Sequence, residues 1–389
     1  MFSTSKIYID RNAVLNNFNF LKMFYGPDIK LSSVIKANAY GHGIEEYVPI
    51  VEDANVSHFS VFSADEAYRV CSVKKDTTNV MIMGAIDDEA MEWVINNNIE
   101  FYVFDIERCE IAINVAKKLN KPAIIHLDIE TGMHRIGLKQ KELNKIVKYI
   151  KQYEQYLIVK GICTHYAGAE SIANYFRINK QISNFKKVYK WLVNHGIIPE
   201  IRHTACSAAS IVYPKTRMDM LRIGILQYGF WPSKETYIHY LNKNINVNKD
   251  IMQNDPLNRV ISWKSEVMSI QDVSVGEFIG YGTSFLAQEN MKIAIIPVGY
   301  AHGYNRSLSN QGRVLIREHI CWVIGIVNMN MLMVDVTKIP YVQKGDEVVL
   351  IGSQGDLTIT VSSFSDFSDQ LNYELLSRLP RDIPRIVLN

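Results

Sequence analysis

A single lysine, Lys36, closes an apolar run of β-forming residues in VIKANAYGHG (34–43), and small residues, a tyrosine and two glycines follow it. Burial at the apolar end of a strand disfavours the charged ammonium and lowers the pKa of the lysine, so its amine becomes a nucleophile. Such an amine can form a Schiff base with an aldehyde cofactor. Taken alone, a lysine after a strand is usually a solvated loop residue, so a functional role for Lys36 depends on the residues around it.

The elements that position this lysine form a repeating pattern. Short β-rich runs alternate with helix-like segments up to about residue 230. In DIERCEIAINVAKKLNK (105–121), apolar residues recur at spacings of three and four, with acids early and lysines late, which predicts a helix. The β-rich runs are LSSVIK, FSVFSA, VMIMG, FYVF, AIIHLD, IVKGICTH, EIRHTA and DMLRIG.

Eight βα repeats in this length predict a (β/α)8 TIM-type barrel. A doubly wound open sheet is the competing arrangement, but no G-x-G-x-x-G motif follows the first strand. Chemistry in such barrels takes place at the carboxyl ends of the strands, so polar groups there are expected to converge. The polar residues at or just after the predicted strand ends are Lys36, Asp128, Arg135, His165, Ser207 and Arg222.

This convergence predicts a pyridoxal phosphate site. Barrels of this kind often bind phosphate with the loops after strands seven and eight. Those loops offer the Ser207 hydroxyl and the backbone N–H groups of Gly224 and Ile225. Singly, each polar residue has an ordinary structural explanation, such as a hydrogen-bonded core histidine for His165 or an ion-pair partner for Arg222. Their common location at one rim favours a site.

The pattern changes beyond about residue 240. INVNKDIMQNDPLN (245–258) is polar and rich in asparagine, which is typical of a linker or exposed excursion. Strand-like pieces with turn residues follow, and no long helix interrupts them before SFSDFSDQLNYELLSRL (363–379). The predicted organisation is a cofactor-binding barrel over residues 1–240 and a mainly-β C-terminal domain over residues 241–389.

Composition excludes several other classes of protein. The chain has 389 residues, 48% hydrophobic and 21% charged, with a net charge of +2, which gives no electrostatic case for binding nucleic acid or an anionic membrane. No signal peptide and no apolar stretch of the ~20 residues needed to span a membrane is expected. The five cysteines are scattered, which argues against disulfides or a zinc site, so no metal is expected and the cytoplasm is the predicted location.

The motifs also resemble those of a known family. VIKANAYGHG is similar to the pyridoxal phosphate attachment motif of the alanine racemases. Further segments resemble the same family in sequence order along nearly the whole chain. They are ETGMHRIGL, GICTHYAGAE, HTACSAA, DMLRIGILQYGFWPS, GYGTSF, PVGYAHGYNR, MNMLMVDV and NYELLSRLPR. The family has a barrel followed by a β domain, as the strand pattern predicts independently.

The resemblance implies roles for individual residues. Lys36 would carry the cofactor and act as one of two proton-transfer bases, and Tyr281 in GYGTSF would be the second base. Tyr281 would reach the active site of the other subunit, which implies a homodimer with shared sites. A cationic network, with His165 and Arg222 as candidates, would favour the tyrosinate. The cofactor-binding positions implied are Lys36, Tyr40, His165, Ser207, Arg222, Gly224, Ile225 and Tyr373.

The substrate site implied by the resemblance contains Arg135, Tyr300 and the backbone N–H of Met329. The implied reaction interconverts L- and D-alanine, which would supply D-alanine for peptidoglycan. An arginine at the ring nitrogen stays protonated and leaves that nitrogen unprotonated, so fewer side reactions on the cofactor are expected.

Three positions depart from the family. Asp128 stands where many members have a lysine, carbamylated in some, whose negative charge orients the arginine that corresponds to Arg135. We hypothesise that the Asp128 carboxylate supplies this charge directly. Asn330 replaces an aspartate beside Met329, and Cys206 replaces an asparagine before Ser207. We expect Cys206 to be an inert thiol rather than a reactive one.

Other functions stay open at this point. A racemase of the same fold could act on serine, on a basic amino acid or on a broad range of substrates, although the bulky Tyr300 and Tyr373 favour a small side chain. Decarboxylases of basic amino acids share the two-domain architecture, but they resemble this chain less than alanine racemases do in the segments GYGTSF and GMHRIG. A non-catalytic pyridoxal phosphate carrier would lack the second domain.

Overall fold

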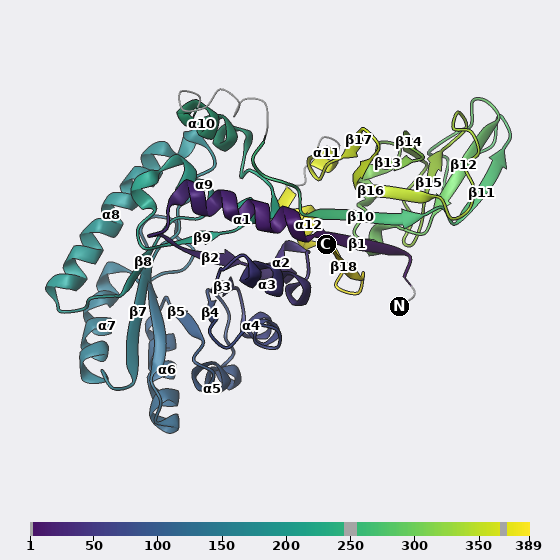
Figure 1. Ribbon diagram of the computed structural model, residues 1–389. Coiled ribbons are helices and arrows are strands. Elements are labelled where there is room, and N and C mark those ends of the chain that lie inside the picture. Colours follow the sequence, from purple (N-terminus) through teal and green to yellow (C-terminus); the bar gives the residue numbers. More distant parts are fainter. Residues whose placement is uncertain (1–2, 245–254, 366–371) are drawn as a thin grey trace. The chain divides into compact units, whose positions relative to one another are not determined.

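The computed structural model describes residues 3–244, 255–365 and 372–389. Contacts divide the chain into two compact units (Figure 1). We call Asn12–Lys36 with Val48–Arg259 the barrel unit. The C-terminal unit contains the residues up to Arg11, the short segment Ala37–Tyr47, and Val260–Asn389. The predicted linker 245–258 lies mostly outside the described residues.

The barrel unit contains an eight-stranded parallel sheet whose strand order is β8-β7-β6-β5-β4-β3-β2-β9. Backbone hydrogen bonds from Asp219 to Arg202 and from Arg222 to Ala205, both 3.1 Å, bring the two edge strands together and nearly close the barrel. The predicted barrel is thus confirmed. Its strands are β2 (Lys30–Val34), β3 (His58–Val61), β4 (Asn79–Ile82), β5 (Glu100–Val103), β6 (Ala123–Asp128), β7 (Leu157–Cys163), β8 (Ile201–His203) and β9 (Met220–Ile223).

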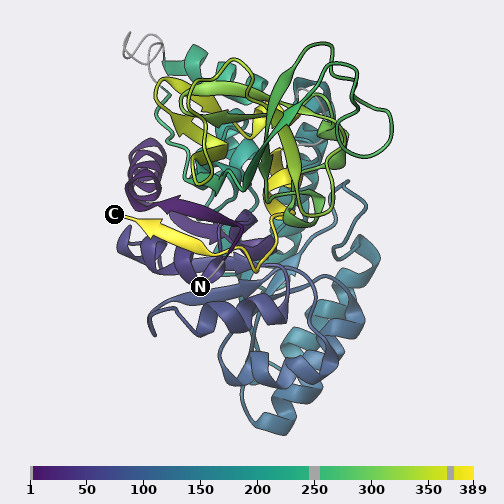
Figure 2. The ribbon, with the colours of Figure 1, turned by 90° about the vertical axis from the view of Figure 1, so that its right-hand side faces the viewer.

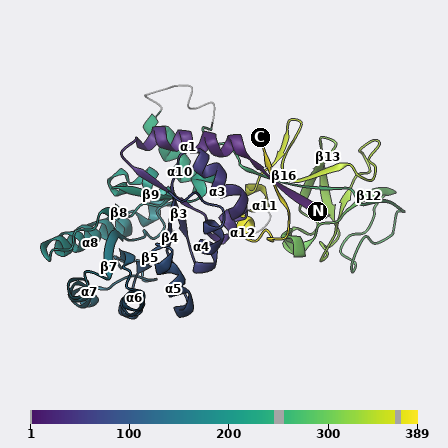
Figure 3. The ribbon, with the colours of Figure 1, turned by 60° about the horizontal axis from the view of Figure 1, so that its bottom comes forward.

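Helices lie outside these strands, as the view in Figure 3 shows for α5 to α8. The barrel strands are mostly buried on both faces, which explains their near-continuous runs of valine, isoleucine and leucine. The helices are α1 (Arg11–Tyr25), α3 (Ile44–Asp53), α4 (Ala64–Cys71), α5 (Asp88–Asn96), α6 (Ile106–Leu119), α7 (Gln140–Gln152), α8 (Tyr175–Asn194), α9 (Ser207–Val212) and α10 (Lys234–Asn244).

Helix α6 illustrates how local sequence sets an element. The Asp105 side chain caps its first turn by accepting a 2.8 Å hydrogen bond from the Arg108 N–H. Cys109, Ile113 and other residues of one face are buried, as their spacing predicted. Asn120 ends the helix in a left-handed conformation with φ of 50°.

The C-terminal unit is built on a ten-stranded sheet within the described residues, as the β-rich sequence predicted. The first strand of the chain also belongs to it, because β1 pairs antiparallel with β10 and parallel with β18, beside which it lies in Figure 2. Its strands are β1 (Ser5–Asp10), β10 (Ile261–Glu266), β11 (Ser269–Val273), β12 (Met291–Ile296), β13 (Arg313–Ile316), β14 (His319–Ile324), β15 (Leu332–Asp335), β16 (Glu347–Gln354), β17 (Leu357–Ile359) and β18 (Arg385–Leu388).

Over 363–379, where the sequence predicted a long helix, the described residues form two short helices, α11 (Ser362–Ser365) and α12 (Asn372–Ser377), and the residues between them are not described. None of the helices in the described ranges is both long and apolar enough to cross a bilayer.

Candidate active site

Polar side chains gather at the carboxyl ends of the barrel strands. Lys36 lies two residues beyond β2, and Asp128 is the last residue of β6. His165 lies two residues beyond β7, and Arg222 lies near the end of β9. Because the strands are parallel, these ends share one rim of the barrel.

Lys36 has the electrostatic environment of a nucleophilic amine. The residue is accessible to solvent, but desolvation of its side chain by the surrounding protein lowers its pKa. The positive charge of Arg135 lowers the pKa further, and Glu66 opposes this shift. A larger fraction of the amine is therefore neutral and nucleophilic at neutral pH than for a free lysine.

His165 lies close enough to three cations to be affected by each. Desolvation lowers its pKa to about 3, and the charges of Arg222, Arg135 and Lys36 contribute in that order. His165 is therefore uncharged at neutral pH. The expectation that both His165 and Arg222 supply positive charge is corrected in this respect, since only Arg222 carries it.

Arg222 is held rigidly inside the barrel. One terminal nitrogen, Nη1, donates to His203 Nδ1 at 2.8 Å and also to the His203 carbonyl. The other, Nη2, donates to the carbonyls of Thr164 at 2.8 Å and Thr204 at 3.2 Å. Sequence reasoning missed His203, because a histidine inside the predicted strand EIRHTA has the ordinary interpretation of a core residue.

The residues expected at the phosphate lie in two adjacent turns of the barrel unit. Ser207 begins α9, and its buried hydroxyl accepts a 2.9 Å hydrogen bond from the Gly224 N–H. Ile225 opens a short 3-10 helix, η3 (Ile225–Tyr228), directly after Gly224. A hydroxyl beside successive backbone N–H groups has the donors that a phosphate requires.

The chain after Lys36 adopts an unusual left-handed turn. Residues 37–40 have φ values of 52°, 55°, 53° and 51°, although none is glycine. Such a conformation costs roughly 1–2 kcal/mol per residue. It is held locally, because the Asn38 side chain accepts from the Ile44 N–H at 3.4 Å and the Arg385 guanidinium donates to the Gly41 carbonyl at 2.9 Å. Strain of this kind clusters at functional sites.

Two tyrosines expected at the cofactor lie together in the C-terminal unit. Tyr40 ends the left-handed turn, and its ring centroid lies 6.0 Å from that of Tyr373 in α12. Tyr40 is buried and Tyr373 is half-buried.

Tyr281 and Met329, expected to serve the other subunit, and Tyr300, expected at the substrate entrance, are exposed. Tyr281 is 70% exposed between two glycines with positive φ, and Met329 and Tyr300 are 56% and 43% exposed. The Tyr300 N–H donates to the Asn328 carbonyl at 3.0 Å, so the loop of Tyr300 lies against the loop of Met329. Gly299 permits this approach, since a Cβ there would lie 2.2 Å from the Asn328 oxygen.

The structure does not support an orienting contact between Asp128 and Arg135. Asp128 is buried, with the Cys163 thiol 3.7 Å away as a weak donor, whereas Arg135 is exposed. Arg135 acts on Asp128 only through its charge, whereas the Cys163 thiol forms a hydrogen bond with the carboxyl. Desolvation raises the pKa of Asp128 to about 7, although the charges of Arg222 and Arg135 oppose the rise. The hypothesis that Asp128 holds Arg135 by direct pairing is therefore not borne out.

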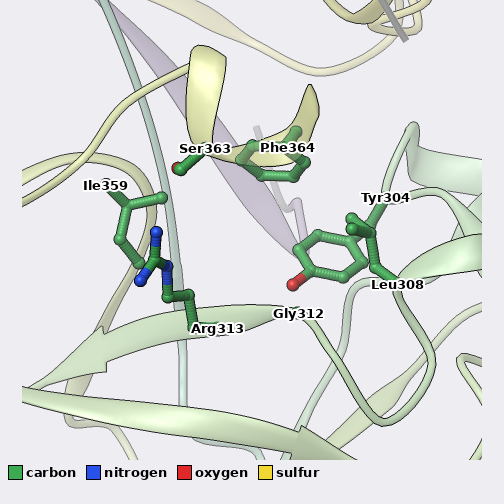
Figure 4. Close-up of a pocket in the computed structure, with 7 residues that line it drawn as sticks. All are labelled: Tyr304, Leu308, Gly312, Arg313, Ile359, Ser363 and Phe364. Carbon is green, nitrogen blue, oxygen red and sulfur yellow. The ribbon is translucent and has the colours of Figure 1, made fainter. Parts of the chain in front are cut away.

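A small cavity in the C-terminal unit is too small for a substrate. Its volume is about 10 Å³, enough for one water molecule. Figure 4 shows the Tyr304 hydroxyl pointing toward Gly312 and Arg313 at this cavity, whose other lining residues include Phe364.

Comparison with known proteins agrees with the geometry. Residues 9–232 match the family model of the alanine racemase N-terminal domain, and residues 260–387 match that of the C-terminal domain. An alanine racemase of Leptospira interrogans is 33% identical over 386 residues, covering 99% of this chain and 96% of the relative. One from Halothermothrix orenii is 32% identical, covering 97% and 95%.

Solved structures are similar over the whole chain. An alanine racemase of Clostridium difficile has a TM-score of 0.89 at 28% identity and covers 100% of this chain and 96% of its own. The enzyme of Bartonella henselae, solved with covalently bound pyridoxal phosphate, has a TM-score of 0.84 at 26% identity and covers both chains fully. The two domain matches and the full-length relatives together place this chain in the alanine racemase family.

Proposed function

We propose that this protein is a pyridoxal phosphate-dependent alanine racemase that uses Lys36 and Tyr281 as opposed bases. The observation that carries the proposal is the rim of the barrel, where an amine with a lowered pKa, a buried arginine and a hydroxyl beside backbone donors follow parallel strands. Relatives named alanine racemase span the whole chain, which makes an isomerase of amino acids the expected class.

The residues present fit pyridoxal phosphate. Lys36 would hold the cofactor covalently, and Ser207 with the N–H groups of Gly224 and Ile225 would bind the phosphate. By the family resemblance Arg222 would face the ring nitrogen. Both of its terminal nitrogens already donate to barrel carbonyls and His203, which leaves Nε as the donor for this contact. When bound, the cofactor supplies the electron sink that stabilises the deprotonated Cα.

The chain's own residues then move the proton. The lowered pKa of Lys36 lets its amine accept a proton from Cα at neutral pH. Tyr281 returns a proton to the opposite face, so the configuration inverts. Arg222 remains a cation throughout and holds its hydrogen bonds, which keeps positive charge in place without giving up a proton.

The proposal requires a homodimer with shared sites. Tyr281, Met329 and Tyr300 are exposed in the C-terminal unit, which leaves them available to a second subunit. The Met329 N–H would bind the substrate carboxylate there. The Met329 carbonyl accepts from the Ala301 N–H at 3.0 Å, so this backbone is held in place.

Alanine is the favoured substrate because the bulky Tyr300 and Tyr373 are expected around the substrate side chain and leave room only for a small one. A racemase for another amino acid is the second candidate, since Asp128 does not pair with Arg135 and Asn330 lacks the charge that the family resemblance implies at its position. In the cell the enzyme would work in the cytoplasm, where its five free cysteines remain reduced, and would supply D-alanine for peptidoglycan.

The test is racemisation of a panel of L-amino acids by the purified, cofactor-loaded protein. Turnover of L-alanine well above serine, lysine and arginine is expected. A preference for another amino acid would support the second candidate and point to Asp128 and Asn330. An absence of racemisation with cofactor bound would refute both.

A further inference from the structure

The interior of the barrel contains a buried polar chain in place of the aliphatic layers usual in this fold. Three histidines, His58, His126 and His203, are fully buried on β3, β6 and β8. Glu100, the first residue of β5, is 3% exposed and lies between two of them. Burying a carboxylate is costly unless hydrogen bonds compensate it, so this arrangement calls for an explanation.

Hydrogen bonds connect these groups continuously to Arg222. His203 Nδ1 lies 2.8 Å from Arg222 Nη1, and His203 Nε2 lies 2.7 Å from His126 Nδ1. His126 Nε2 lies 2.9 Å from Glu100 Oε2. His58 Nε2 reaches the same oxygen at 3.1 Å.

The two ends of this chain together set the direction of every bond in it, because a guanidinium can only donate and an ionised carboxylate can only accept. A guanidinium can only donate, so His203 Nδ1 must accept and its proton must lie on Nε2. His126 Nδ1 then accepts from His203, and the His126 Nε2–H donates to Glu100. His58 also donates its Nε2–H to Glu100, while the Ser32 hydroxyl, 2.8 Å away, satisfies its Nδ1.

This assignment agrees with the electrostatics of the groups. Desolvation lowers the pKa of His203 well below its usual value, and the nearby His126 and Arg222 contribute, so His203 is neutral. Desolvation would raise the pKa of Glu100, but hydrogen bonds from His126 and His58 outweigh it and hold that pKa below its usual range. Glu100 is therefore an anion, and the chain has a cation at one end and an anion near the other.

The backbone makes room for this chain. A Cβ at position 161 would lie 2.1 Å from His126 Nδ1, so only glycine fits beside that ring. The pairing of β6 with β7 also shifts register between Ile125 and His126, opposite Gly161. Irregularities of this kind commonly re-aim a side chain, which here is His126.

We propose that the Glu100 carboxylate is a positioning group that fixes the tautomers of His126 and His203, and through them holds Arg222 in its orientation. This inference rests on the proposed function only where it assigns Arg222 to the ring nitrogen of the cofactor. If the carboxylate is removed, the His126 Nε2–H loses its anionic acceptor. The chain can then reverse, and a His203 with its proton on Nδ1 no longer accepts from Arg222.

The direct test is 15N NMR of the full-length, cofactor-loaded protein labelled at histidine. Wild-type His126 and His203 are expected as neutral Nε2–H tautomers across neutral pH. A His203 that carries its proton on Nδ1, or that is doubly protonated, would overturn the proposal without any variant. If these tautomers are found but no amino acid is racemised, the proposed function fails and the hydrogen-bond chain stands.

A pair of variants tests the consequence for Arg222. In Glu100→Gln we expect altered tautomer signals from His126 or His203, a shifted absorbance of the bound cofactor, and a fall in kcat on the order of 10-fold or more at full cofactor loading. Glu52→Gln is the matched control, because Glu52 is similarly buried and accepts from the Lys75 N–H and the Thr78 hydroxyl outside this chain. We expect the control to leave tautomers and cofactor absorbance unchanged. Unchanged tautomers and kcat in Glu100→Gln would refute the proposal.

Discussion

Asp128 allows a quantitative test of the electrostatics at the barrel rim. Its carboxyl is buried at the end of β6, and desolvation raises its pKa from 3.8 to about 7. Asn at this position keeps the shape and removes the charge. Asp128→Asn therefore separates the cost of the buried charge from the packing of the side chain.

The direction in which stability changes with pH follows from the linkage between proton binding and folding. Because the folded-state pKa is the higher one, the stability that the protonated carboxyl provides is complete below about pH 4 and is lost as pH rises to about 7. At about 1.4 kcal/mol per pH unit over the roughly two units between pH 5 and the folded-state pKa, the wild type should lose about 3 kcal/mol of unfolding free energy between about pH 5 and pH 8 relative to Asp128→Asn. Above about pH 8 the difference should be constant.

The assay is urea unfolding of both proteins followed by circular dichroism at a series of pH values, at fixed protein and cofactor concentrations. Other titrating groups are common to both proteins and cancel in the difference. Parallel stability curves over this range would show that the Asp128 carboxyl is not desolvated as the structure indicates, and would refute the reasoning.

Three further outcomes are expected. Tyr281→Phe should keep the cofactor absorbance and lose racemisation by on the order of 10²- to 10⁴-fold; turnover within a few-fold of wild type would exclude Tyr281 as a base. Gly41→Ala should lower the free energy of chemical unfolding by about 3 kcal/mol, because the φ of Gly41 is +80° and a Cβ would lie 2.0 Å from the Leu376 carbonyl oxygen. An unchanged denaturant midpoint would contradict that geometry. Cys206→Ser should leave cofactor affinity within a few-fold in a titration, because serine is at least as good an N-cap of α9 as cysteine; a large loss would mean that the thiol contacts the cofactor.

The barrel was predictable because its strands are short, buried on both faces and rich in β-branched residues. All eight predicted runs coincide with β2 to β9, and α6 follows its apolar spacing. The polarity of a parallel sheet then places Lys36, His165 and Arg222 at one rim without further information.

Other features depend on contacts that local sequence does not encode. β1 pairs with β10 and β18, which lie far from it in the sequence. Sequence patterns, which compare only neighbouring segments, therefore cannot assign β1 to the C-terminal unit. The left-handed turn at residues 37–40 contradicts the preferences of its own residues and exists because surrounding hydrogen bonds hold it. Glu100 and His58 are the first residues of their strands, where polar residues usually face solvent, so their burial was not foreseen.

The most direct test of the central claim is complementation between two inactive variants. Lys36→Ala lacks the cofactor lysine and Tyr281→Phe lacks the second base, so each homodimer should be inactive toward L-alanine. In a dimer that combines the two, one of the shared sites keeps both native residues. Random exchange of equal amounts should then restore about a quarter of wild-type alanine racemisation. Mixed dimers that form, as verified by co-purification of differently tagged chains, but stay inactive would contradict the account.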